Sequence, residues 1–127
     1  MAQTKKKLLV VEDEVSLLNA LVDMFTQEGL NVIQAKDGKN GLELAQKEHP
    51  DLILLDILLP KISGLEVLER LRKDDWGKSA KVILLTNLSD TRTLAYALSY
   101  DVHTYLVKSD LDVDFLIKKV KEYLKIK

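Results

Sequence analysis

Five side chains of complementary chemistry occur where short apolar runs of the sequence end. Glu12 and Asp13 follow the first run, Asp56 the third, Thr86 the fourth and Lys108 the fifth. Carboxylates held together repel one another unless a hard cation lies among them, and Mg²⁺ prefers oxygen ligands of this kind. A carboxylate can also act as a nucleophile toward phosphorus, with a metal ion and a lysine offsetting charge on the phosphoryl oxygens. Phosphoryl transfer is therefore the chemistry that these residues favour if they meet.

One acidic residue after an apolar run is usually a helix cap or a solvated loop residue. The phosphoryl-transfer hypothesis therefore depends on whether the secondary structure brings the five candidate residues together. Several of the runs lack polar alternation, which is typical of parallel strands covered on both faces. The predicted strands are Leu8–Val11, Val32–Ala35, Leu52–Leu55, Val82–Leu85 and Tyr105–Val107.

Segments with the period of a helix lie between and after these runs. The predicted helices are Glu14–Glu28, a helix capped by Asp37 that runs to about Lys47, Ser63–Lys73, Asp90–Tyr100 and a last helix capped by Asp112. Val15, Leu18, Val22 and Phe25 are predicted to face inward from the first helix. Val113, Leu116, Ile117, Val120 and Leu124 are predicted to do so from the last.

Strands and helices alternate strictly along the chain, which indicates an α/β fold with a parallel sheet and helices on both faces. Such sheets hold their functional sites at the carboxyl ends of the strands, near the point where the strand order reverses. All five candidate residues follow strands directly, so the fold class predicts that they share one edge of the sheet.

Composition narrows the class of protein further. The chain has 127 residues, 46% of them hydrophobic, with a formal net charge of −1 and no cysteine. This length suits one domain, and the balanced charge gives no overall attraction to nucleic acid or membrane. Disulfides and thiol catalysis are excluded. No apolar run is long enough to span a bilayer and no signal peptide is evident, so a cytoplasmic location is expected.

The joint order of several motifs resembles the receiver domain of two-component response regulators, in particular the stand-alone, chemotaxis-type receivers. The matching stretches are Leu8–Glu14, Pro50–Pro60, Ser63–Glu66, Leu85-Thr86 and Tyr105–Lys108. The resemblance implies a flavodoxin-like (βα)5 three-layer sandwich with a five-stranded parallel sheet in the order 2-1-3-4-5. It also implies that residues 1–127 form one receiver domain with no output domain of its own.

The resemblance assigns a role to each residue of the site. Asp56 would accept a phosphoryl group from a sensor histidine kinase or a histidine phosphotransfer protein. Asp13, Asp56 and the backbone carbonyl of Leu58 would ligate Mg²⁺, and Glu12 would hold the metal through water. Lys108 would pair with Asp56 and then with the phosphoryl oxygens. Such a protein is not an enzyme in the usual sense, because it catalyses only its own phosphorylation and dephosphorylation.

The resemblance also implies a signalling surface. Thr86 would move to hydrogen-bond the phosphoryl group, and Tyr105 would turn inward behind it. The face of helix four, strand five and helix five, with Tyr96, Tyr105 and Phe115 exposed on it, would then bind a downstream protein or a second copy of the chain. Leu17, Leu21 and Met24 are predicted to lie off the inward stripe of helix one, where the family contacts its phosphodonor.

Four positions depart from the common pattern of the family. Glu12 replaces a frequent aspartate, and Asn87 stands where a small residue is commoner. Ser109 replaces the usual proline after the lysine, which puts in doubt the cis peptide often found there. Asp101 stands where glycine is frequent, at a position where a left-handed helix end would cost more than at glycine.

Three other functions fit the sequence less well than that of a receiver. A haloacid-dehalogenase-like phosphatase needs a second aspartate two residues after its nucleophile, and that residue here is Leu58. A flavodoxin-like FMN binder needs a phosphate-binding loop after strand one, where Glu12, Asp13 and Glu14 would repel phosphate. A receiver-like interaction module that is never phosphorylated would not need the full acidic, hydroxyl and lysine set.

Overall fold

One parallel sheet of five strands in the order β2-β1-β3-β4-β5 forms the centre of the molecule. The structure is a computed structural model, and it describes residues 5–87, 89–102 and 104–126. The strands are β1 Lys7–Val11, β2 Asn31–Ala35, β3 Leu52–Leu55, β4 Val82–Thr86 and β5 Thr104–Val107. The predicted strand order is confirmed, and the predicted strand bounds differ from these by at most one residue at either end.

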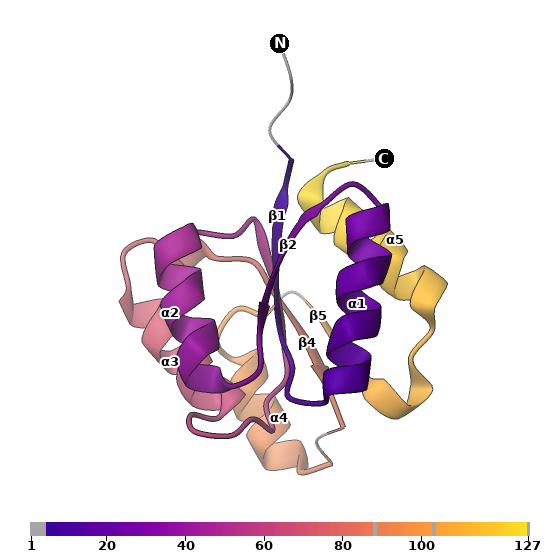
Figure 1. The fold of residues 1–127 in the computed structure, drawn as a ribbon. Coiled ribbons are helices and arrows are strands. Elements are labelled where there is room, and N and C mark those ends of the chain that lie inside the picture. The colour runs from indigo at the N-terminus through magenta and orange to yellow at the C-terminus, as the bar shows by residue number, and fades with distance from the viewer. Residues whose placement is uncertain (1–4, 88, 103, 127) are drawn as a thin grey trace.

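Five helices cover the two faces of the sheet and complete a three-layer sandwich (Figure 1). They are α1 Val15–Gln27, α2 Gly38–Glu48, α3 Gly64–Lys73, α4 Thr91–Leu98 and α5 Val113–Leu124, with short 3-10 turns at Gly77–Ser79 and Lys108–Asp110. Residues of α2, α3 and α4 pack on one face, while α1 and α5 pack on the other. The α/β fold class predicted from the sequence is therefore confirmed.

The central strands are apolar throughout because both of their faces are buried. In β1, Leu9 and Val11 belong to the core beneath α2 and α3, whereas Leu8 and Val10 belong to the core beneath α1 and α5. This pattern explains why the runs in the sequence show no polar alternation.

Side chains at the helix starts fix where the loops above the sheet turn into helices. The Asn40 N–H donates to Asp37 Oδ1 at 2.7 Å, and the Phe115 N–H donates to Asp112 Oδ1 at 3.2 Å. Both caps satisfy a backbone donor that has no partner within the helix. The two capping aspartates predicted from the sequence are confirmed.

The inward stripes predicted for α1 and α5 are wrong at their first residues. Val15 and Val113 are exposed, whereas Leu21, assigned to an outer docking edge, is buried with Leu18. Val15 and Val113 are the first residues of α1 and α5, and side chains on a helix point back toward its N-terminus, away from the residues that pack on the sheet. The buried stripe of α1 is Leu18, Leu21 and Phe25, which follows the helical period from a later start.

The loop between β3 and α3 is pressed against the start of α3. The Gly64 N–H donates to the Ile57 carbonyl at 2.8 Å. A Cβ at Gly64 would lie 2.1 Å from the Asp56 carbonyl oxygen and 2.7 Å from Ile57 Cα, both of them backbone atoms that cannot rotate away. Only glycine fits at this position, so the residue that follows β3 is held directly by the helix after it.

We expect Gly64→Ala to lower the free energy of unfolding by about 3 kcal/mol, because the new methyl group overlaps the backbone of Asp56 and Ile57. Urea unfolding followed by circular dichroism measures the change. Gly29→Asn is the matched control, because Gly29 has φ +89 and open space around it, and asparagine tolerates that region. Equal losses in the two variants would contradict the close-approach argument.

Candidate functional site

Three carboxylates meet at the carboxyl edge of the sheet. Each of Glu12, Asp13 and Asp56 offers an oxygen that lies within 4.8 Å of the others. Glu12 is 2% exposed and Asp56 3% exposed, whereas Asp13 is open to solvent. β1 and β3 are neighbours in the sheet, so the residues that follow them must lie side by side. The predicted convergence of the acidic residues is therefore found in the structure.

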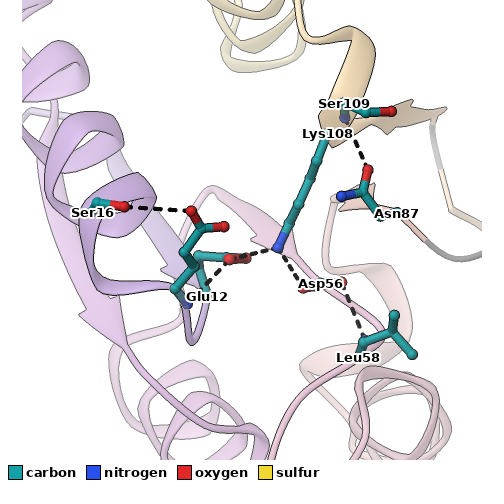
Figure 2. A network of polar contacts seen from close by, with 8 residues as sticks. Glu12, Ser16, Asp56, Leu58, Asn87, Lys108 and Ser109 are labelled. Atoms are coloured by element: carbon teal, nitrogen blue, oxygen red, sulfur yellow. Dashed lines mark hydrogen bonds and ion pairs between the residues drawn. The ribbon is translucent and has the colours of Figure 1, made fainter.

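Lys108 links the two buried carboxylates. Its Nζ lies 2.5 Å from Glu12 Oε1 and 2.6 Å from Asp56 Oδ2 (Figure 2). The lysine follows β5, at the edge of the sheet, and its long side chain reaches across the end of β4 to the cluster. A buried charge needs a partner, and the ammonium provides one for two carboxylates at once.

The pKa values of this pair shift for different physical reasons. Burial raises the pKa of Glu12, and the opposing hydrogen bond and charge of Lys108 do not fully reverse that effect. Burial lowers the pKa of Lys108, but hydrogen bonds to Asp56 and Glu12 outweigh it, so the net shift is upward. Both pKa values are therefore raised. Lys108 gains from two carboxylate partners, whereas Glu12 is buried and must share a single ammonium with Asp56.

Backbone N–H groups also donate to the two buried carboxylates. The Leu58 N–H donates to Asp56 Oδ1 at 3.1 Å, and the Glu14 N–H donates to Glu12 Oε1 at 3.3 Å. The side chain of Leu58 points outward and is 54% exposed (Figure 2). Both oxygens of Asp56 thus have a polar partner, which holds the carboxyl group in one orientation.

The donor set fits a hard divalent cation. Carboxylate oxygens are the ligands that Mg²⁺ prefers, and the exposed side of the cluster at Asp13 leaves room for the waters that Mg²⁺ retains. One ammonium faces three carboxylates, so a cation would also offset negative charge that Lys108 leaves uncompensated.

Thr86 and Tyr105 lie on the two strands at the other side of the cluster. Thr86 is buried, ends β4 and is paired with Val107 of β5 in the sheet register. Tyr105 is 41% exposed on β5, and Tyr96 of α4 and Phe115 of α5 are exposed as well. The predicted exposure of these three aromatic side chains is confirmed.

An apolar hollow opens beside the acidic cluster. It has a volume of about 540 Å³ and lies between the loop after β3, with Leu58 and Pro60, and the helices that carry Leu65 and Thr93; Asp13 also lines it. No pattern in the sequence predicts this hollow, because its walls come from segments far apart in the chain.

Two further contacts lie outside what the sequence predicts. The Ser109 N–H donates to Asn87 Oδ1 at 2.9 Å, which joins two positions that depart from the family pattern. The Lys108–Ser109 peptide is trans. The one signal in the sequence for this bond is that two residues unusual for the family, Asn87 and Ser109, follow neighbouring strands.

Arg72 of α3 makes the second unforeseen contact. Its guanidinium donates to the carbonyls of Gly77 and Ala80 at 2.7 and 2.9 Å, and to those of Tyr100 and Asp101 at 2.7 and 3.1 Å. Asp101 has φ 58, the left-handed conformation considered for it from the sequence. Every residue has a carbonyl, so the sequence carries no signal for these acceptors.

Comparison with known proteins places these features in a family. A model of the response regulator receiver domain matches residues 8–121. A probable transcriptional regulator, ycf27, from Cyanophora paradoxa is 37% identical over 108 residues, which are 85% of this chain and 44% of that protein. The response regulator ArlR of Staphylococcus aureus is 35% identical over 119 residues, 94% of this chain and 52% of that protein. The chain spans about half the length of these curated relatives.

Solved structures are similar over nearly the whole chain. A CheY-like receiver domain protein from Methanospirillum hungatei has a TM-score of 0.88 and 28% identity, covering 96% of this chain and 95% of that one. The response regulator TrrA of Thermotoga maritima, solved in complex with Mg(2+)-BeF, has a TM-score of 0.80 and 37% identity, covering 93% and 98%. In the part of the chain that the structure describes, no helix combines the length and apolar character needed to cross a bilayer.

We expect Glu12→Gln to stabilise the metal-free protein by about 1 kcal/mol at pH 7, because it removes a carboxylate whose charge is disfavoured by burial. The pKa of Glu12 is higher in the folded chain than its ordinary value of 4.5, so folding favours the protonated form. The cost of the charged form is therefore present above the folded pKa and disappears toward pH 4.5. The gain from glutamine should shrink accordingly as the pH falls.

Urea unfolding in chelator at several pH values measures this gain. Glu43→Gln, at an exposed position of α2, is the matched control and should change stability little. A loss of stability in Glu12→Gln at pH 7, or a gain that grows as the pH falls, would show that the Glu12 charge is favourable in the folded protein.

Proposed function

Because this chain belongs to the response regulator receiver domain family, we propose that it is a phosphorylation-controlled switch of a two-component signalling system, with Asp56 as its phosphoacceptor. The observation that carries the assignment is the position of the Asp56 carboxylate. It is buried, one oxygen lies 2.6 Å from Lys108 Nζ, and two further carboxylates stand beside it. The receiver domain is proposed to span residues 1–127.

The proposed reaction is an in-line transfer to a carboxylate oxygen of Asp56. That oxygen forms a bond to phosphorus while the phosphorus–nitrogen bond of a phosphohistidine breaks, and the imidazole leaves with the electron pair. Lys108 stays protonated and shifts its hydrogen bonding toward the phosphoryl oxygens. The hydroxyl of Thr86, at the end of the neighbouring strand, donates to the same group. The apolar hollow beside Asp13 is the side from which the phosphodonor approaches.

Mg²⁺ is the proposed cofactor, held by Asp13, Asp56 and the backbone carbonyl of Leu58, with Glu12 acting through water. When bound, the ion offsets negative charge on the phosphoryl oxygens. The arrangement of three carboxylates within 4.8 Å supports this assignment, as does their excess over the single ammonium of Lys108. The residues that would hold the ion are those whose repulsion it would relieve.

The partners follow from the proposed chemistry. The phosphodonor is a sensor histidine kinase or a histidine phosphotransfer protein, and the receiver catalyses only the gain and loss of its own phosphoryl group. The signal leaves through α4, β5 and α5 to a downstream protein or to a second copy of the chain. Nucleic acid and membrane are not proposed as direct partners, and the cytoplasm is the proposed location.

We expect Asp56→Asn to abolish labelling by a small acyl phosphate in the presence of Mg²⁺, because the amide is a poor nucleophile. Intact-mass measurement should show one added phosphoryl group on the parent chain and none on the variant. Asp75→Asn, an exposed aspartate on the loop after α3, is the matched control and should label normally. Labelling of the Asp56 variant at the parent level would refute the assignment.

Phosphorylation is proposed to act on the signalling face through Thr86 and Tyr105. Thr86 ends β4 directly before the loop that leads into α4, so its displacement toward the phosphoryl group changes the start of that loop. Tyr105 is half-exposed on the neighbouring strand, and its proposed response is to turn inward behind Thr86. The two residues thus connect Asp56 to the surface that carries Tyr96 and Phe115.

We expect beryllofluoride with Mg²⁺, used as a phosphoryl mimic, to change amide hydrogen exchange in α4 and β5 by about fivefold. Thr86→Ala should remove most of this change even at a mimic concentration that saturates the variant, since the coupling passes through the hydroxyl. Hydrogen exchange with mass detection measures both effects, and Thr26→Ala on α1 serves as the control. An unchanged response in Thr86→Ala would exclude Thr86 as the link.

A further inference from the structure

Two loops at the carboxyl edge of the sheet are joined by a single side chain. The pairing of β4 with β5 ends at Thr86 and Val107. One step beyond it, Asn87 follows Thr86 and its Oδ1 accepts the Ser109 N–H at 2.9 Å (Figure 2). The side-chain bond therefore continues the connection between the two strands past the end of their backbone pairing.

The bond depends on both residues being of these types. Proline at position 109 would have no N–H to donate, and alanine or glycine at position 87 would have no oxygen to accept it. Asn87 and Ser109 are also two of the positions where the sequence departs from the family pattern. The structure shows that the two departures form one interaction.

The bond restrains the backbone directly after Lys108. Ser109 directly follows Lys108, whose backbone opens the 3-10 turn Lys108–Asp110. Lys108 reaches Glu12 and Asp56 through a flexible four-carbon stem, so the place of its ammonium depends on where its backbone is held. On one side that backbone is fixed by the end of β5, and on the other by Asn87.

We infer that Asn87 is a positioning residue for Lys108: by binding the Ser109 N–H it holds the start of the turn after β5, and so keeps the ammonium aimed at Asp56 for phosphoryl transfer. The inference rests on the proposed function, since it assigns a task at the same site. It differs from a general stabilising role, because it predicts an effect on the reaction that requires both an acceptor at 87 and a donor at 109.

The test compares rates of phosphorylation by acetyl phosphate at saturating Mg²⁺, followed by intact mass. Asn87→Leu keeps the size of the side chain but loses the acceptor, and we expect it to slow the reaction about fivefold. Asn87→Asp keeps an oxygen in the same place and should stay within about twofold of the parent. Asn19→Leu, at an exposed position of α1, is the matched control and should react at the parent rate.

A double-mutant comparison separates positioning from simple loss of structure. Ser109→Pro removes the donor, so in that background Asn87→Leu should have no further effect. Urea unfolding identifies any variant that loses its fold, and Asn87→Ala replaces Asn87→Leu in that case. A parent-like rate in Asn87→Leu overturns the inference, and so does a slowing that is equally large when Ser109 is proline.

Exchange of the Ser109 amide measures the bond without any phosphoryl transfer. It should be slow in the parent chain and about tenfold faster in Asn87→Leu. Equal exchange in the two proteins overturns the inference whatever happens at Asp56. Labelling that persists in Asp56→Asn overturns the proposed function instead, while normal Asp56-dependent labelling with equal rates across the Asn87 variants overturns the inference alone.

Discussion

The ammonium of Lys108 between two buried carboxylates is the interaction on which the rest of the site depends. Glu12 and Asp56 follow adjacent strands at the centre of the sheet, where almost no water reaches them. Without a cation beside them, two such charges would have to lose their ionisation or leave the interior. The strand order puts β5 far enough away that only a long side chain can supply that cation, and lysine is long enough.

The same interaction leaves the site with an imbalance that suits reversible chemistry. One positive charge faces three negative ones, so the pocket favours a metal ion, and a phosphoryl group added to Asp56 brings further oxygens for cations to bind. Backbone donors from Leu58 and Glu14 hold the carboxylates in place whichever cation is present. Gly64 adds rigidity, because α3 begins in direct contact with the backbone of Asp56.

The sequence was sufficient for the fold and for the meeting of the acidic residues with Lys108, because both follow from where apolar runs end. Burial on both faces makes strands easy to recognise, and a parallel sheet brings their ends to one edge. Other features depend on distances that no pattern encodes. The buried stripe of α1 starts at Leu18 and not at Val15, and Arg72 binds carbonyls that any residue would offer. The bond from the Ser109 N–H to Asn87 depends on how the two loops after β4 and β5 approach each other, which the sequence does not specify.

The contacts of Arg72 have a mechanical consequence for α4. The guanidinium holds the carbonyls of Tyr100 and Asp101, just beyond the last turn of α4, and ties them to the loop after α3. Of the eight residues of α4, only Ala97 is buried, and it lies near the same end. The first turn, next to the loop from Thr86, has no comparable anchor among the described contacts. The helix is therefore anchored at its C-terminal end, and Tyr96 belongs to that anchored end, because the Tyr100 hydroxyl donates to the Tyr96 hydroxyl at 3.0 Å. A displacement of the loop after Thr86 would consequently move the first turn of α4 more than it moves Tyr96.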